Sequence, residues 1–260
     1  MSTTKPTPTS ADVIDAPTST AVMTWKEKMA AVVAQAASSE APKGGFLSFK
    51  GGNISYDDQL IPGNTMDVIV VDFLLENGIF RDKYNANKPA SPMCYAIGRD
   101  EESLKPHQDC EEPQHTDCET CPNNEWGSDP EGGRGKACKN TRRIAMIPAD
   151  CLKNGVEGIR KAGTVMCKLP VMSVKNFSTF INQCTKAMEL PPFGVVVRMN
   201  TKPHPTSLFQ VNWTILNSIE NQEYMEALYN KHVAAEKMLF QPYPKMEEEA
   251  APAQKASKKF

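Results

Sequence analysis

A Cys-x-x-Cys pair at Cys118 and Cys121 is the feature that most constrains this chain. Two cysteines at this spacing present two thiolates from one tight turn, as a tetrahedral zinc ion requires. A thioredoxin-like redox pair instead needs a strand before the motif and a helix after it. Here the motif continues as Pro122-Asn123-Asn124, which disfavours a helix. We therefore predict a structural zinc site in preference to a redox pair or a chance occurrence.

The remaining zinc ligands have to come from elsewhere in the chain. Cys138 is the expected third ligand, because three glycines just before it allow the returning loop to fold back tightly. The candidates for the fourth ligand are Cys94, Cys110, His107 and His115. We favour Cys94, since its apolar, strand-like surroundings would anchor the loop to the body of the protein. Four protein ligands leave no open position for a substrate, so such a zinc ion would be structural.

The chain is organised as one core between two low-complexity ends. Its 260 residues suffice for one large domain or two small ones. Residues 1–22 are rich in Thr, Pro, Ser and Ala, and such a segment buries too little apolar surface to offset its ordering entropy. Residues 24–38 show the apolar period of a helix. We expect a disordered N-terminal tail with one short helix over 1–43, a core over 44–240 with the zinc loop at about 94–140, and a disordered C-terminal tail over 241–260.

The core is predicted to be mainly β. Eight short apolar or alternating runs are typical of strands. They span residues 46–49, 54–56, 66–75, 92–97, 141–147, 164–169, 195–199 and 209–215. Two helices are expected, one capped by Ser173 and ended by Pro191, the other over residues 221–240 with His232 at its boundary with the core. We predict an α+β chain with an OB-like β-barrel core, an inserted zinc loop and peripheral helices.

The charge of the loop is unevenly divided. Asp100 to Glu131 contains eleven acidic residues and one lysine, whereas Gly132 to Arg143 contains five basic residues and no acid. A basic, glycine-rich segment can follow a phosphate backbone closely, and Trp126 on the same loop could stack on bases. The alternative is that Trp126 packs over the thiolates and that the basic run pairs with the acidic arm. The predicted DNA contacts are Trp126, Arg134, Lys136, Lys139, Arg142 and Arg143.

Other patterns exclude several classes of function. Arg142 and Arg143 would face opposite ways in a strand, and so would Asp67 and Asp72, which makes that carboxylate pair a poor metal site. We find no Walker loop, no Gly-x-Ser-x-Gly, no His-Glu-x-x-His and no zinc-deaminase signature, and predict that the protein is not an enzyme.

Eight cysteines without a secretory leader indicate a reducing compartment. The longest apolar stretch, near Val68, is too short to span a membrane.

The order of several motifs resembles a family of tailed-phage proteins. These motifs are Pro92-x-Cys94, Cys118-x-x-Cys121-Pro122, Trp126-Gly127-Ser128, Gly133-x-Gly135-Lys136-x-Cys138, Arg142-Arg143, Leu169-Pro170-x-x-Ser173-x-x-x-Phe177 and Pro192-Phe193-Gly194-Val195-Val196. The resemblance covers about residues 46–216. Members of this family are similar to phage single-stranded DNA-binding proteins, which have an OB-like core and in some cases an embedded zinc.

The resemblance carries several implications. It implies Cys94, Cys118, Cys121 and Cys138 as zinc ligands, and the cytoplasm of an infected bacterial host as the location. It implies single-stranded DNA as the ligand, with replication or recombination proteins as further partners. The C-terminus departs from the acidic, apolar-tipped tail of such proteins, because Glu247–Glu249 is followed by three lysines before Phe260.

Two functions are therefore expected. The first is a single-stranded DNA-binding protein of phage replication or recombination, which holds the strand by backbone charge and base stacking without catalysis. The alternative is a zinc-stabilised protein-interaction or transcription-regulating module whose acidic arm, Asp100 to Glu131, binds a protein.

Overall fold

The computed structural model describes residues 25, 29, 45–57, 59–81 and 91–243. The chain divides into two compact units, Met1–Pro42 and Lys43–Phe260. In the first unit Trp25 and Met29 are helical and exposed. The rest of the helix expected over 24–38, and both low-complexity ends of the chain as far as residue 22 and from residue 244, lie outside the described residues.

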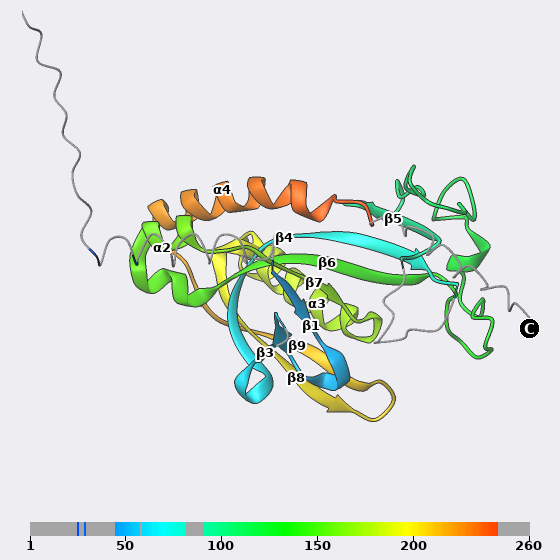
Figure 1. Cartoon of the computed structure of the whole chain (residues 1–260), viewed down its shortest axis with the longest axis horizontal. Helices are drawn as coiled ribbons and strands as arrows, with labels where there is room; N and C mark the ends of the chain where they lie inside the picture. Colours follow the sequence, from blue (N-terminus) through cyan, green and yellow to red (C-terminus); the bar gives the residue numbers. More distant parts are fainter. Residues whose placement is uncertain (1–24, 26–28, 30–44, 58, 82–90, 244–260) are drawn as a thin grey trace, which may run out of the picture. The chain divides into compact units, whose positions relative to one another are not determined.

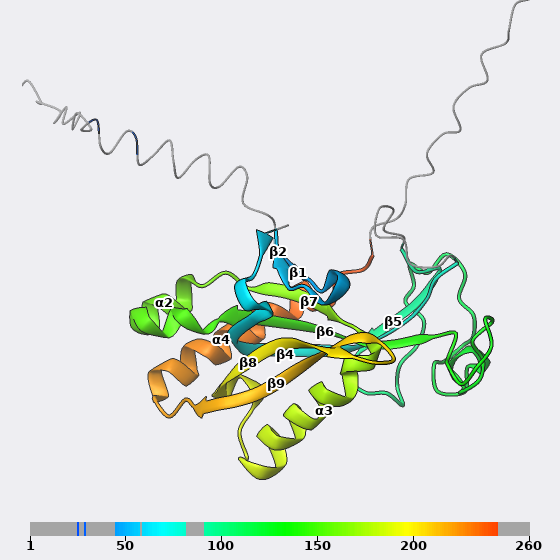
Figure 2. The same ribbon diagram turned by 90° about the horizontal axis from the view of Figure 1, so that it is seen from below.

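One mixed sheet organises the second unit (Figure 1). Its strand order is β3-β2-β1-β7-β6-β4-β8-β9, and β5 pairs with β4 beside this path. All pairings are antiparallel except the parallel pair β1–β7. The strands are β1 (Phe46–Ser48), β2 (Ser55–Tyr56), β3 (Gln59–Leu60), β4 (Thr65–Ile79), β5 (Cys94–Gly98), β6 (Lys139–Pro148), β7 (Val165–Leu169), β8 (Val195–His204) and β9 (Leu208–Ser218). The sheet curls into a half-barrel (Figure 2), so the prediction of an α+β chain with a barrel-like core is confirmed.

β4 is the central strand and carries a β-bulge between Val70 and Asp72. Before the bulge Val68 and Val70 lie in the core on the inner face of the sheet, and Ile69 and its neighbour Val71 in the core on the outer face. The extra residue shifts the alternation by one position, so that odd-numbered residues face inward after it.

The bulge corrects one expectation from simple alternation. Asp67 and Asp72 lie on the same outer face, although strict alternation predicts opposite faces. They do not approach each other as metal ligands, because each binds its own arginine. Arg198 holds Asp67 with bonds of 2.7 and 2.8 Å, and Arg99 holds Asp72 with bonds of 3.0 and 2.9 Å.

The inner face of the sheet packs on α3, which spans Val174–Asn182 and continues as a π-helical turn over Gln183–Ala187. Phe177 and Phe180 of this helix contact Trp213 of β9, with ring centroids 5.1 and 5.8 Å apart. Ser173 precedes the helix, but its side chain does not cap it as predicted. Its Oγ instead accepts a hydrogen bond of 2.9 Å from the backbone N–H of Val211, which satisfies part of the open edge of β9.

The outer face is covered by α2 (Gly155–Lys161) and α4 (Gln222–Leu239). The side chain of Asn221 accepts a hydrogen bond of 3.0 Å from the N–H of Tyr224 and so caps α4. His232 of α4 lies at the boundary of the core, as predicted, with Nδ1 3.0 Å from the carbonyl oxygen of Val71. Among the helices of the described residues, none combines the length and apolar character that crossing a bilayer requires.

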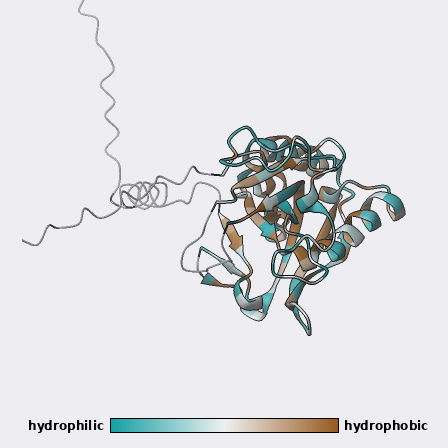
Figure 3. Ribbon diagram, turned by 90° about the vertical axis from the view of Figure 1, so that its right-hand side faces the viewer, coloured by the Kyte–Doolittle hydropathy of each residue, from teal (hydrophilic) through white to brown (hydrophobic). Residues whose placement is uncertain are grey.

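A long insertion joins β5 to β6 and projects from one end of the sheet, opposite the end where α2 lies (Figure 1). It includes one short helical turn, η3 (Pro122–Asn124). Seen from this end, the loops of the insertion are largely hydrophilic, while the strands behind them carry the hydrophobic residues (Figure 3). The insertion therefore needs something other than a large apolar core to fix its conformation.

Candidate functional site

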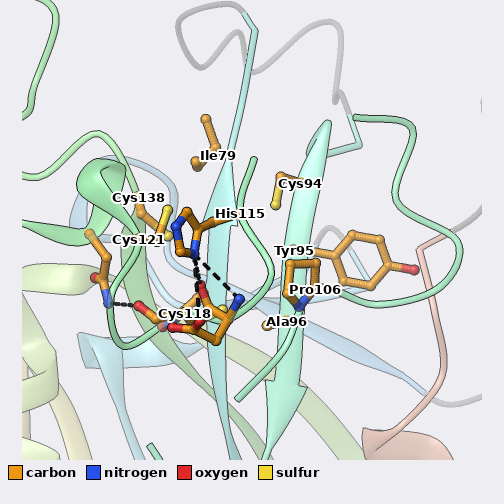
Figure 4. A pocket seen from close by; sticks show the side chains of 12 residues that line it. Ile79, Cys94, Tyr95, Ala96, Pro106, His115, Cys118, Cys121 and Cys138 are labelled. Carbon is orange, nitrogen blue, oxygen red and sulfur yellow. Dashed lines mark hydrogen bonds and ion pairs between the residues drawn. The ribbon is translucent and has the colours of Figure 1, made fainter. Parts of the chain in front are cut away.

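The four predicted zinc ligands lie around one small pocket at the base of this insertion (Figure 4). Cys94 begins β5, Cys138 immediately precedes β6, and Cys118 and Cys121 lie on the loop between them. Each is less than a tenth exposed, with relative accessibilities of 6 to 8%. All four line one small pocket, together with His115 and the end of β4.

Backbone hydrogen bonds hold the two arms of the insertion together. Asn124 donates from its backbone to the carbonyl of Cys121 and from its side chain to that of Cys118, both at 2.8 Å. The N–H of Cys138 donates to the carbonyl of Asn123, also at 2.8 Å. The return arm turns at Gly132, whose φ of 85° disfavours other residues. The expected tight return of the loop is therefore confirmed.

The surroundings of the thiols are both buried and hydrogen-bonded. Burial is the largest cause that raises the pKa of Cys118 to about 11 and that of Cys138 to about 12, and repulsion from the neighbouring cysteines contributes to both increases. The side chain of Asn77 and the backbone of Gly78 donate hydrogen bonds to these two sulfurs. Donors of this kind support thiolates in metal sites. Because the thiols are protonated at neutral pH, a bound cation would have to displace their protons.

The pocket suits a small cation in its donors and its size. Its volume is about 10 Å³, close to the space that one water molecule needs. As the side chains stand, no three His, Cys, Asp or Glu of the described residues converge on a common metal position. The sulfurs would have to move by rotation about χ1 to bind one ion. Four cysteines around one small pocket are, in kind and number, the donors that a structural zinc ion uses.

The structure separates the candidates for the fourth ligand. Cys110 lies beside Cys94, but its thiol donates to the carbonyl of Tyr95 and its sulfur accepts from the Tyr95 N–H, both at 3.1 Å. His107 stacks on the ring of Tyr95 with centroids 5.0 Å apart, outside the pocket. His115 lines the pocket, and its Nδ1 lies 3.2 Å from the carbonyl oxygen of Asp117. Metal-binding histidines commonly make such a contact and coordinate through Nε2. Cys94 and His115 therefore line the pocket itself, whereas Cys110 lies beside it, packed against Cys94 and Cys138.

Exposed Trp126 and half-buried Lys136 form a pair on the insertion. Trp126 is 79% exposed, so it does not pack over the thiolates. The Nζ of Lys136 lies 5.2 Å from the centre of its ring and donates to Asn124 Oδ1 at 3.2 Å. Arg134 is also exposed. Trp126 and Lys136 therefore present an aromatic face with one positive charge beside it, and Arg134 adds a second cation on the same loop.

The other predicted DNA contacts have partners within the protein. Lys139 binds Asp129 at 2.8 Å, so part of the basic arm pairs with the acidic arm. Arg142 faces the inner side of β6, where burial lowers its pKa and Glu101 opposes that shift. Arg143 faces the outer side, which confirms that the two arginines point opposite ways. Its side chain is 11% exposed and forms an ion pair with Glu76.

A buried polar cluster around Glu76 was not predicted. Glu76 is 1% exposed and binds Arg143 and, at 2.5 Å, Lys168. Tyr243 donates to the carboxylate at 2.6 Å and accepts from Lys168 at 2.9 Å. Burial alone would raise the pKa of Glu76, but Lys168 and Arg143 outweigh it and lower the pKa. From the sequence, an acidic residue within an apolar strand indicates that a cation must be buried beside it, but the sequence does not identify which cation.

This cluster also holds the segment that follows α4. Arg143 also donates to the backbone carbonyls of Leu239, at 3.0 Å, and Gln241, at 2.5 Å. These bonds tie Gln241 and Tyr243, which lie in the tail expected over 241–260, to the sheet.

Comparisons of the chain with protein-family models, with curated proteins and with solved structures found no match.

Proposed function

We propose that this chain is a single-stranded DNA-binding protein of phage replication or recombination, with an OB-like barrel as its core. The observation that carries the proposal is the strand order β7-β6-β4-β8-β9 with α3 between β7 and β8. In an OB barrel the first strand pairs with the second and the fourth, and a helix stands between the third and the fourth. The pairings β4–β6, β4–β8, β6–β7 and β8–β9 support this assignment, in which β4, β6, β7, β8 and β9 would be the five strands in chain order.

The two loops that such barrels use for oligonucleotides then have clear counterparts. The insertion belongs to the connection between the first and second strands, and the β8–β9 turn joins the fourth and fifth. On the insertion, Trp126 offers an exposed ring, and Arg134 and Lys136 supply positive charge. Stacking of a base on such a ring contributes about 1–3 kcal/mol.

In this proposal one structural zinc ion holds the insertion, bound by Cys94, Cys118, Cys121 and Cys138. A tetrathiolate zinc supplies cross-linking of loop segments that lack a large apolar core. The four thiols fasten the ends of β5 and β6 to the Cys118–Cys121 turn, and the Trp126 segment is the direct continuation of that turn. The site takes no part in a reaction.

The test is a salt series of binding measurements on single-stranded DNA, duplex DNA and RNA. Replacing Arg134, Lys136 and Lys139 together by alanine should weaken binding to all sequences alike. It should also reduce the log–log salt slope by about 1.4 units, since Arg134 and Lys136 would each contribute about 0.7 on a single strand, whereas Lys139 is already paired with Asp129. Trp126→Ala should lower affinity with little change in slope, because stacking releases no counterions.

The matched control replaces Lys153, Arg160 and Lys161, three exposed cations at the opposite end of the sheet, by alanine. This variant should bind like the wild type. Zinc content is measured in every variant, because a lost metal would disorder the loop. Equal affinity of the wild type, the loop triple variant and Trp126→Ala, with zinc retained, would contradict the insertion as a DNA site.

A protein-interaction module is the second candidate, and one observation favours it. The Lys139–Asp129 pair neutralises part of the basic arm within the insertion, while Glu101, Glu102 and Glu119 of the acidic arm are exposed. Such an arm would bind a basic protein surface. This function predicts no binding to any nucleic acid in the salt series, with the zinc site intact.

A further inference from the structure

The turn of the β8–β9 hairpin displays one leucine under unusual conditions. Leu208 is 81% exposed and has a φ of 64°. An L-residue with a side chain adopts this left-handed region only at a cost, which Asn and Asp bear more easily than others. Among the described residues, the other non-glycine residues with positive φ are Asp57, Asn64 and Glu189, all polar. Leu208 therefore combines two unfavourable features, backbone strain and apolar exposure.

Local hydrogen bonds hold this turn in place. His204 Nδ1 accepts from the N–H of Thr206 at 3.4 Å and lies 3.0 Å from Ser207 Oγ. Ser207 makes two hydrogen bonds with Phe209. The Ser207 Oγ donates to the Phe209 carbonyl at 3.0 Å, and the Ser207 carbonyl accepts from the Phe209 N–H at 2.7 Å. Leu208 is thus presented by a fixed turn, with its side chain directed away from the core.

The chain around this leucine is suited to a polyanion. The chain contains 31 acidic residues, but none lies between Leu190 and Ile219. Lys202 on the hairpin is exposed. The turn that carries exposed Lys50 packs against the same hairpin, because Thr201 Oγ1 donates to the carbonyl of Gly52 at 2.5 Å. An apolar tip flanked by lysines matches a ligand that has both phosphates and uncovered bases.

We infer that Leu208 packs against a base of the bound single strand, with Lys202 and Lys50 beside its phosphates. The inference rests on the proposed function and adds a second contact surface, separate from Trp126. The hairpin tip and the insertion lie toward the same end of the sheet in both views, so one strand could meet both (Figure 1, Figure 2). Duplex DNA buries its bases in stacking, so this contact favours single strands.

The experiment compares three full-length variants with the wild type by fluorescence titration on a labelled single-stranded oligonucleotide. Leu208→Asn keeps the left-handed backbone accessible and removes the apolar side chain. It should weaken binding about tenfold with an unchanged salt slope and an unchanged melting midpoint. Leu208→Phe should retain the wild-type affinity. Leu216→Asn, at an exposed leucine 42% accessible on the same strand, is the control and should bind normally.

Each outcome decides between the two proposals. Wild-type affinity of Leu208→Asn, while the loop variants lose affinity, overturns the hairpin contact and leaves the proposed function standing. Loss in Leu208→Asn but not in Leu216→Asn supports the contact, whatever the loop variants do. Equal loss in both leucine variants overturns a specific role of the tip. A wild type that binds no nucleic acid overturns both proposals.

Discussion

The hydroxyl of Tyr243 donates a hydrogen bond of 2.6 Å to the carboxylate of Glu76, and this bond ties the last described residue of the chain to the central strand. Arg143 and Lys168 complete the cluster from two neighbouring strands. Such a buried network is stabilising only while every member is paired, because each unpaired charge retains its full desolvation cost. Removing one member of the cluster should therefore lower the stability of the protein by a measurable amount.

Replacing Glu76 by glutamine should lower the free energy of unfolding by about 3 kcal/mol, because two buried cations lose their counter-charge. The measurement is urea unfolding at neutral pH. Asp67→Asn is the control, since Asp67 pairs with Arg198 at the surface, where both side chains are at least 36% exposed. That pair should contribute less than about 1 kcal/mol. Similar losses in the two variants would contradict the importance of the buried cluster.

Glu76 should also make stability depend on acid pH. Its pKa in the folded protein lies below the ordinary value of 4.5, although burial opposes this, because Lys168 and Arg143 favour the charged form. A carboxyl with a lowered folded pKa contributes its full stabilisation above the unfolded pKa and loses it as the pH falls through the folded pKa. As the pH falls from about 5, the free energy of unfolding of the wild type should therefore decrease more than that of Glu76→Gln, because only the wild type has a carboxyl to protonate at this position. Parallel pH profiles would assign the acid sensitivity to other groups.

The C-terminal boundary can be tested by truncation. A chain of residues 44–243 should melt like the full-length protein, because the low-complexity ends are not part of the predicted core. A chain of residues 44–240 should melt about 5 °C lower, since it loses the hydrogen bonds of Tyr243 to charged partners. Equal midpoints for the two truncated chains would show that Tyr243 contributes little.

Metal analysis should find about one zinc ion per chain. Cys118→Ser should lose the metal and loosen the insertion. Cys151→Ser, Cys167→Ser and Cys184→Ser should keep it, because these cysteines lie in the two cores of the sheet, away from the pocket. Full zinc content in Cys118→Ser would contradict the site.

Cobalt substitution can identify the fourth ligand. Cys94→Ser should reduce the intensity of the sulfur-to-cobalt charge-transfer bands and weaken metal binding. His115→Ala should leave these bands unchanged if four thiolates bind the metal. The reverse result would assign three thiolates and His115. Cys110→Ser should retain the spectrum, because this thiol is engaged with the backbone of Tyr95.

The sequence predicted those features of the structure that depend on residues close together in the chain. Alternating and β-branched runs predicted the positions of the longer strands. The Cys-x-x-Cys spacing, the glycine-rich return and the strand-like run at Cys94 together predicted the four cysteines that line one pocket. The seven-residue helix α2 was missed, because Gly155 and Gly158 interrupt its apolar period.

Features that depend on distant partners were not predictable in the same way. The bulge after Val70 reverses the alternation without any mark in the residue pattern. Ser173 has a normal capping sequence, yet its hydroxyl serves Val211, a residue 38 positions away. The partners of Glu76 likewise come from segments far apart in the chain, and only their packing brings them together.

The fifteen residues of β4 have a mechanical consequence. Its first part pairs with β8 inside the half-barrel, and its last part pairs with β5 at the root of the insertion. A pull along this strand would load many hydrogen bonds of the ladder at once, in shear, instead of opening them one by one. Tension applied to the insertion would therefore pass directly into the half-barrel through one continuous strand.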